Sequence, residues 1–416
     1  MTRSALVVAG ILAALLFAEI SARFLPLPDV RRTGDGAEPR GELWVDAEWR
    51  LPPPRAFRLD PVLMVDHERY FQTFVPVAEH AGKQFKFATN GYGLRRDGEI
   101  SIEKPPGVFR ILVLGDSQTD GLVDNQETYS ARLEARLHAR NVNAEVLNAG
   151  VTGYSPQQSY LWYRERGAQL RPDVVILGLY VGNDLLDLIE SKLDARVIDD
   201  DLGLLNPLYQ PLDWISIHSR LARMASYTMR DSGLAPILEA LGYHRPPPVE
   251  LDRVLRVLKD CHGCWLQSGK QAVVAGQRPE ETRAAFGRLR TLIAGLDARV
   301  AANGGQLILL PIPTKNQVEP SDDRGNVTKM QRILEMDERG LTFDDRVFSA
   351  VAEVANEKRI PLVDAREDLA TSGRGERGYY RRDWHLNPRG NSVVAESLDR
   401  YLAAHGTLVM RSAAAQ

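Results

Sequence analysis

Cysteine is scarce in this chain, and its charges nearly cancel. Only two of the 416 residues are cysteine, which excludes a disulfide-rich scaffold. The formal net charge is −3, and there is no basic run or aromatic-rich stripe, so nucleic-acid binding is not expected. Hydrophobic residues make up 44% and charged residues 26% of the chain, as in ordinary folded enzymes. A chain of this length can form one large domain with additions, or two domains.

The two cysteines, Cys261 and Cys264, stand in the local motif Cys-His-Gly-Cys-Trp. A haem-attachment motif needs histidine directly after the second cysteine, where this chain has Trp265. A zinc site would need two further ligands, and no second Cys or His pair has a suitable spacing. A disulfide across a tight turn is favoured for an exported protein, with reduced structural thiols and a metal or redox role as alternatives. We expect no metal and no organic cofactor.

The N-terminus carries a long hydrophobic run. Residues 5–18 are apolar without a break, and Arg3 precedes them. Extended to Leu25, the segment reaches the roughly 20 residues that a membrane-spanning helix needs. We therefore expect residues 1–27 to be a signal anchor or transmembrane helix, with the rest of the chain on the extracytoplasmic, periplasmic face. A cleaved signal peptide and a buried core helix are the alternatives, although Ile20-Ser21-Ala22 is a poor cleavage site.

Strand and helix patterns alternate from residue 108 onward. Apolar runs predict strands at 109–114, 144–148, 173–180, 306–311 and 360–363. Helices are expected around 127–140, 156–167, 280–303, 344–358 and 391–404. Buried apolar strands that alternate with helices predict an α/β fold, with a parallel sheet and helices on both faces.

Two regions depart from this alternation. Residues 28–107 are rich in Pro, Arg and acidic residues, and short strands are expected between Phe71 and Phe87. This region is too small and polar to hold a core alone, so we predict an N-terminal cap region on the main domain. Residues 187–280 are predicted to form a mainly helical, lid-like insertion, with helices around 215–229 and 249–260. The main domain then spans residues 108–410.

Polar residues stand where the predicted strands end and where the last helix begins. Ser117 follows the first strand in the segment Gly-Asp-Ser-Gln-Thr-Asp-Gly, Gly153 follows the second strand, and Asn183 follows the third. Asp383 and His385 stand just before the last helix. Because the carboxyl ends of parallel strands meet at one edge of a sheet, we expect these residues to converge there.

These residue types are the ones that acyl transfer through a serine requires. The hydroxyl of Ser117 is a poor nucleophile until a base such as His385 removes its proton. Asp383 can orient the imidazole and stabilise its charged form. The backbone N–H groups of Ser117 and Gly153 and the side-chain amide of Asn183 can donate to the oxyanion of a tetrahedral intermediate.

Each of these residues also has a plain structural alternative. A Gly-Asp-Ser turn can be structural, Asn183 can cap a helix, and His385 can be a surface histidine. The occurrence of all four blocks in order, each at the expected end of the sheet, argues against coincidence. The carboxylate of Asp116 is expected to bond N–H groups of the turn, and Asp120 and Asp184 are expected to be solvated or to stabilise turns.

In these four blocks the chain resembles the SGNH (GDSL-like) hydrolases, a family of serine esterases and lipases named for Ser, Gly, Asn and His. Ser117, Gly153, Asn183 and His385 match the blocks in the family's order. The resemblance covers about residues 108–190 and 285–405 and implies a flavodoxin-like three-layer α/β/α sandwich.

Three further segments refine this resemblance. Asn-Gly-Tyr-Gly-Leu-Arg at 90–95 resembles an Asn-x-x-Gly-Leu-Arg element of membrane-anchored bacterial members, and 311–315 resembles a family loop after the fourth strand. Many members space the acid and the histidine as Asp-x-x-His, whereas here only one residue separates Asp383 from His385. That spacing resembles the branch that acylates or deacylates exopolysaccharides in the bacterial periplasm.

The resemblance implies a serine esterase that hydrolyses or transfers a short acyl group, acetyl first of all, through an acyl-Ser117 intermediate. The ester substrate would be an acylated glycan or another extracytoplasmic ester. One alternative is a polysaccharide O-acetyltransferase that takes acetyl from a membrane-bound O-acyltransferase partner. Another is a non-catalytic, membrane-anchored glycan-binding protein.

Overall fold

The central sheet consists of four parallel strands: β5 (Phe109–Leu114), β6 (Ala144–Asn148), β7 (Val174–Tyr180) and β10 (Gln306–Ile312). They lie in the order β6-β5-β7-β10, and Leu362 adds a parallel bridge to Leu309 beyond β10. Counted along the chain this is the order 2-1-3-4-5 of flavodoxin-like sheets, which confirms the predicted fold class. The computed structural model describes residues 14–18, 20–21, 56–60, 62–77, 83–189, 195–198, 201–204, 275–276, 278–319, 343–372, 377–380 and 385–405.

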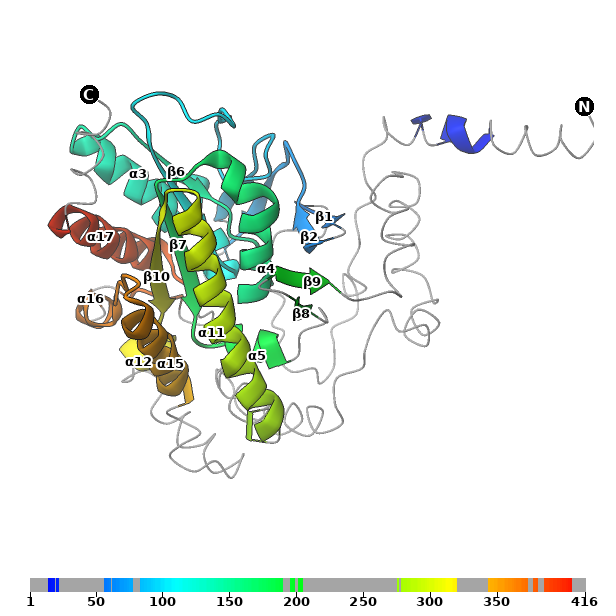
Figure 1. Cartoon of the computed structure of the whole chain (residues 1–416). Coiled ribbons are helices and arrows are strands. Elements are labelled where there is room, and N and C mark those ends of the chain that lie inside the picture. The colour runs from blue at the N-terminus through cyan, green and yellow to red at the C-terminus, as the bar shows by residue number, and fades with distance from the viewer. Residues whose placement is uncertain are drawn as a thin grey trace, which may run out of the picture.

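Side chains alternate along the strands between two apolar cores. In β5, Leu112 and Leu114 pack into one cluster, whereas Ile111 and Val113 pack into the other. The first cluster is covered by α4 (Pro156–Trp162), α5 (Asp184–Ile189), α11 (Pro279–Ala302) and α15 (Phe343–Lys358). The second is covered by α3 (Tyr129–Ala139), α12 (Lys315–Val318), α16 (Arg366–Ser372) and α17 (Pro388–Ala404). The sheet is therefore the middle of three layers (Figure 1).

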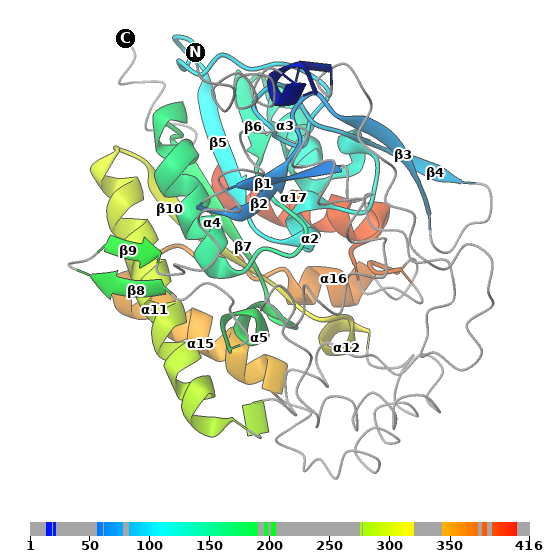
Figure 2. The ribbon, with the colours of Figure 1, turned by 90° about the vertical axis from the view of Figure 1, so that its right-hand side faces the viewer.

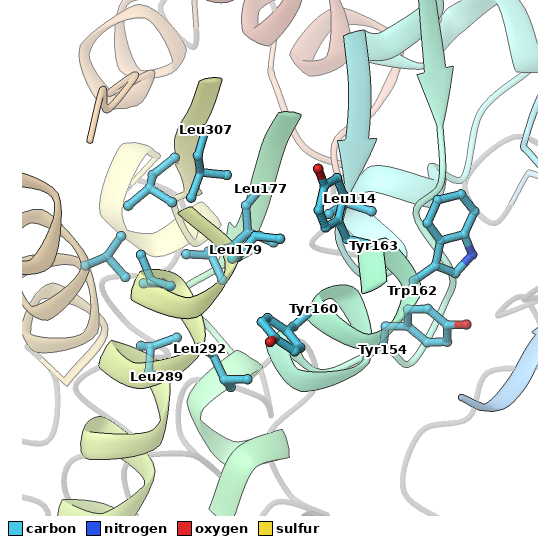
Figure 3. Packing of buried hydrophobic residues seen from close by; sticks show 14 of the residues in the cluster. Leu114, Tyr154, Tyr160, Trp162, Tyr163, Leu177, Leu179, Leu289, Leu292 and Leu307 are labelled. Carbon is cyan, nitrogen blue, oxygen red and sulfur yellow. The ribbon is translucent and has the colours of Figure 1, made fainter. Parts of the chain in front are cut away.

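The first core joins the sheet to the helices over it. Figure 3 shows Leu177 and Leu307 of the strands, with Tyr160 of α4 and Leu292 of α11 among the residues of this cluster. All four side chains are buried. Burial of such side chains stabilises a fold by roughly 1.5–3 kcal/mol each, so the sheet is a rigid base for the loops at its edge.

Capping residues decide where the helices begin. Asn387 accepts a hydrogen bond from the N–H of Gly390, and Pro388 occupies the first turn of α17. Proline suits that position because the N–H it lacks would have no partner inside the helix. The helix therefore begins three residues before the predicted start at 391, and its N-terminus is fixed just after His385. The helix predicted over 156–167 is α-helical only to Trp162 and continues as a π-helical turn, η3 (Tyr163–Gly167).

The N-terminal region contributes two antiparallel hairpins. One pairs β1 (Phe57–Asp60) with β2 (Met64–His67), and the other pairs β3 (Gln72–Pro76) with β4 (Gln84–Ala88). The second hairpin contains the strands expected between residues 71 and 87. Leu63 and Leu94 join the first core of the main domain, and Phe87 forms a smaller cluster with Leu122 and Val123. Figure 2 shows β1 and β2 beside α2 (Ser117–Asp120), the short helix that carries Ser117.

Much of the remaining chain lies outside the described residues. Within the predicted insertion 187–280, the described part includes an antiparallel hairpin of β8 (Ala195–Ile198) and β9 (Asp201–Leu204). Both cysteines and the helices expected around 215–229 and 249–260 fall outside it. At the N-terminus, residues 14–18 and 20–21 are helical. Among the described residues, no helix combines the length and hydrophobicity needed to span a membrane.

Candidate active site

Ser117 begins a single helical turn at the carboxyl end of β5. Asp116 caps this turn, because its carboxylate accepts a hydrogen bond of 2.9 Å from the N–H of Gln118. The prediction that Asp116 bonds N–H groups of the turn is therefore confirmed. Gln118 and Thr119 are buried, whereas Ser117 is only partly buried. The turn thus lifts the serine out of the sheet edge between β5 and β7, the switch point where ligands bind in flavodoxin-like sheets.

His385 approaches Ser117 from the other end of the chain. Its Nε2 lies 2.8 Å from Oγ of Ser117. The backbone N–H of Leu386 donates to the side-chain oxygen of Gln118 at 3.1 Å, and the N–H of Tyr380 donates to the carbonyl of His385 at 3.1 Å. His385 is only 4% exposed, so it is not a surface histidine. The main chain on both sides of the serine–histidine contact is therefore held in place.

The acid expected two residues before this histidine, Asp383, lies outside the described residues. A buried carboxyl group close to the serine is that of Asp116. Burial raises the pKa of Asp116 to about 6, although the N–H of Gln118 and the nearby His385 oppose that rise. One oxygen of Asp116 is buried without a hydrogen-bond partner in the part of the chain that the structure describes.

Asp184, the first residue of α5, is a second buried carboxyl group near the site. It is 4% exposed, so the interpretation of this residue as solvated is wrong. Burial raises its pKa well above the ordinary value, and the negative charges of Asp116 and Asp187 raise it further. A carboxyl group in such a place holds its proton more strongly than one in water. Nothing in the sequence around Asp184 distinguishes it from a solvated turn residue.

The two further predicted oxyanion donors follow β6 and β7. The side-chain amide of Asn183 donates one N–H to the carboxylate of Asp187 at 3.0 Å, and the backbone carbonyl of Asn183 accepts from the N–H of Asp187 at 2.8 Å. Asn183 therefore directly precedes α5, its backbone carbonyl accepts a hydrogen bond from the helix, and its side-chain amide keeps a second hydrogen. Gly153 is exposed, with a φ of 85° and no atom within 4 Å of where a Cβ would stand. Glycine adopts this left-handed conformation without the steric cost that other residues incur.

Asp120, the last residue of α2, is fully buried, which contradicts the expectation that it is solvated. Its Oδ2 accepts from the hydroxyl of Thr152 at 2.6 Å and lies 3.3 Å from Nε2 of His67. Its Oδ1 lies 3.3 Å from a guanidinium nitrogen of Arg95. Burial alone would raise the pKa of Asp120, but His67, Arg95 and Thr152 outweigh it and hold the pKa below the ordinary value. The carboxylate does stabilise a turn, as expected, through Thr152.

Sequence reasoning missed the support that His67 and Arg95 give to this site. Arg95 is buried and donates to the carbonyl oxygens of Asp120, Gly121 and Val123 as well as to Asp120 Oδ1. It ends the Asn-Gly-Tyr-Gly-Leu-Arg segment, so that segment was the available signal. His67 had no comparable signal, because it lies in a short strand with no recognisable motif.

One family of known proteins matches part of the chain. Residues 264–415 match a family described as "SGNH hydrolase-like domain, acetyltransferase AlgX". This match supports an SGNH hydrolase. It also supports an enzyme of the esterase or acetyltransferase type. The matched range contains His385 but not Ser117, Gly153 or Asn183. No curated protein matches the chain.

Several solved structures are distantly similar to this chain. LAE5, an alpha/beta hydrolase enzyme from the metagenome of Lake Arreo, Spain, is 18% identical, with 72% of this chain and 95% of that chain covered and a TM-score of 0.35. A catalytic mutant of Axe2, an acetylxylan esterase from Geobacillus stearothermophilus, is 14% identical, with coverage of 70% and 92% and a TM-score of 0.35. TesA is 14% identical, with coverage of 71% and 98% and a TM-score of 0.34.

Proposed function

We propose that this chain is a serine esterase or acyltransferase that moves a short acyl group, most simply acetyl, through an acyl-Ser117 intermediate. The observation that carries the proposal is the 2.8 Å contact between Ser117 Oγ and His385 Nε2 at the switch point of the sheet. That separation lies within the range for direct proton transfer between a nucleophile and its base. A non-catalytic glycan-binding protein would have no need of this contact.

In the first half of the reaction, Nε2 of His385 takes the hydroxyl proton while Ser117 Oγ attacks the carbonyl carbon of the ester. The resulting oxyanion is stabilised by the N–H groups of Ser117 and Gly153 and by the free amide hydrogen of Asn183. The bond to the alcohol then breaks, and His385 donates the proton to the departing oxygen. The products are the free alcohol and an acylated serine.

In the second half, an acceptor hydroxyl attacks the acyl carbon while His385 removes its proton. The bond between Ser117 Oγ and the acyl group breaks, and the proton returns to the serine. Water as acceptor makes the protein an esterase, and a sugar hydroxyl makes it a transferase. Asp383, two residues before the base, is proposed to orient the imidazole and stabilise its charged form.

An acylated glycan is the proposed ester substrate. The family that matches residues 264–415 is described as an acetyltransferase, which favours transfer of acetyl as the second candidate function. The apolar run at residues 5–18 supports a membrane-anchored protein whose site faces the periplasm. A membrane-bound O-acyltransferase is then the proposed source of acetyl groups.

The purified full-length chain tests this proposal with p-nitrophenyl acetate as substrate and a fluorophosphonate as a label for the nucleophile. We expect hydrolysis, and we expect labelling at Ser117 that is lost in the Ser117→Ala variant. The absence of both would overturn the proposal. Addition of an unacetylated oligosaccharide separates the two candidates, because a transferase releases p-nitrophenol faster when the acceptor is present and acetylates that acceptor.

A further inference from the structure

The turn that carries Ser117 is bonded directly to the loop that carries Gly153. The N–H of Val151 donates to the carbonyl of Gly115 at 3.1 Å, and the side-chain amide of Asn148 donates to the carbonyl of Thr119 at 2.8 Å. Gly150 lies so close to α2 that a Cβ there would stand 2.5 Å from the backbone nitrogen of Asp120. The loop therefore reaches Gly153 along the surface of α2.

The carboxylate of Asp120 contacts Thr152, the residue directly before Gly153. Its Oδ2 accepts two hydrogen bonds from Thr152, 2.6 Å from the hydroxyl and 3.2 Å from the backbone N–H. On the other side of Gly153, the hydroxyl of Tyr154 donates to the carbonyl of Val65 in β2 at 2.8 Å. Both neighbours of Gly153 are thus fixed, whereas Gly153 itself faces open space.

Two residues of the N-terminal region, His67 and Arg95, also hold the Asp120 carboxylate. His67 of β2 lies 3.3 Å from Oδ2 through Nε2, and its Nδ1 lies 3.2 Å from the carbonyl of Gly93. Arg95 contacts Oδ1 at 3.3 Å. The side chains of His67, Arg95 and Asp120 are completely buried. The buried carboxylate of Asp120 is bonded to the cation Arg95 and to His67, so it has little freedom to move. Thr152 is therefore bonded to a group that is itself fixed.

We propose that Asp120 is a positioning residue, which fixes the Gly153 N–H for the oxyanion by holding Thr152, and that His67 and Arg95 keep it in place. This rests on the proposed acyl-transfer function. It makes the N-terminal cap region a structural part of the active site. A donor displaced by about 1 Å can cost on the order of 10²-fold in rate, so the hydrogen bonds of Thr152 matter although Thr152 itself does not touch the reacting atoms.

The test replaces Thr152 in the full-length chain. Thr152→Val keeps the shape of the side chain but loses the hydroxyl, and we expect kcat for p-nitrophenyl acetate to fall about 10-fold while KM changes less than about twofold. The rate of fluorophosphonate labelling should fall in parallel, because that reaction also places an oxygen among the oxyanion donors. Thr152→Ser restores the hydroxyl and should recover most of the lost rate. Thr291→Val, an exposed position on α11, is the matched control and should leave kcat unchanged.

Asp120→Asn provides a second variant, since it keeps the shape and removes the charge that Arg95 and His67 hold. It should also lower kcat with little change in KM. If the unmodified chain is active, two results would overturn the positioning role. One is a wild-type kcat in Thr152→Val, and the other is an equal loss of kcat in Thr152→Val and Thr152→Ser. Failure of the proposed function looks different, because the unmodified chain would then show no hydrolysis and no labelling of Ser117.

Discussion

The hydroxyl oxygen of Ser117 lies 2.8 Å from Nε2 of His385, although 268 positions separate the two residues in the chain. Their neighbours are bonded as well, because the N–H of Leu386 donates to Oε1 of Gln118. The serine lies on the turn after β5, and the histidine lies just before α17. Two independent contacts therefore hold the proposed nucleophile and base together.

Removal of either member of this pair should abolish activity. In Ser117→Ala no atom attacks the ester, and in His385→Ala no group accepts the serine proton. We expect kcat for p-nitrophenyl acetate to fall on the order of 10⁵–10⁶-fold in each variant. Far-ultraviolet circular dichroism and the thermal midpoint should stay close to those of the wild type. Substantial activity in Ser117→Ala would show that another nucleophile is used.

Asp383→Asn should be less severe than either of those changes. The asparagine can still occupy the same space, but it cannot stabilise the imidazolium, so we expect a loss of about 10²–10⁴-fold in kcat. The contrasting variant is Asp116→Asn, because Asp116 is buried near His385. Full activity in Asp383→Asn together with a large loss in Asp116→Asn would assign the orienting carboxylate to Asp116.

Asn183→Ala should lower kcat by about 10²–10³-fold with little change in KM, because an oxyanion donor acts mainly in the transition state. Asn303→Ala is the matched control, since Asn303 is an exposed asparagine at the end of α11. The side chain of Asn183 also bonds the carboxylate of Asp187 in α5, so the thermal midpoint of the variant is measured beside its kinetics. A lowered midpoint with unchanged kcat would assign the side chain of Asn183 a structural role alone.

Asp116→Asn should make stability less dependent on pH. Burial raises the pKa of Asp116 in the folded chain to about 6, from an ordinary value of 3.8. This carboxyl group therefore favours the folded state most below its unfolded pKa, and that contribution is lost as the pH rises through about 6. Between these limits the thermal midpoint of the wild type should decline relative to that of Asp116→Asn. Asn can still accept the hydrogen bond from Gln118.

The control for this measurement of the thermal midpoint against pH is Asp364→Asn, which removes an exposed carboxylate. Its curve, measured over the same pH range, shows the effect of removing one surface charge. Parallel curves for wild type and Asp116→Asn would contradict the raised pKa of Asp116.

Arg95→Met should destabilise the chain strongly. It leaves the buried Asp120 carboxylate without its cation and removes the donors to the carbonyls of Gly121 and Val123. We expect a loss of about 3–5 kcal/mol in the free energy of unfolding, measured by urea denaturation. Arg95→Lys should recover only part of this loss, since an ammonium group cannot reproduce the planar fork of the guanidinium. Arg283→Met, at an exposed position, should stay within about 0.5 kcal/mol of the wild type.

The sequence by itself determined the order of the elements and where the candidate site residues lie on the sheet. Buried strands of a parallel sheet are continuous apolar runs, so β5 and β6 have the predicted bounds. Turn residues directly after such strands must lie at the carboxyl edge of the sheet. Ser117 follows β5 and Asn183 follows β7, so both lie at that edge as predicted. The strand predicted at 360–363 is reduced to a single bridge at Leu362, because local pattern does not specify how far an edge segment pairs.

Only the tertiary structure decided which polar residues are buried and which side chains they contact. Asp120 and Asp184 have the sequence surroundings of solvated turn residues, yet both are buried in the fold. Burial and pKa depend on the segments that pack over a residue, and His67 and Arg95, which reach Asp120, come from a separate part of the chain. The same reason explains why the motif around Ser117 predicted a nucleophile but not the buried contacts that hold the loop of Gly153 beside it.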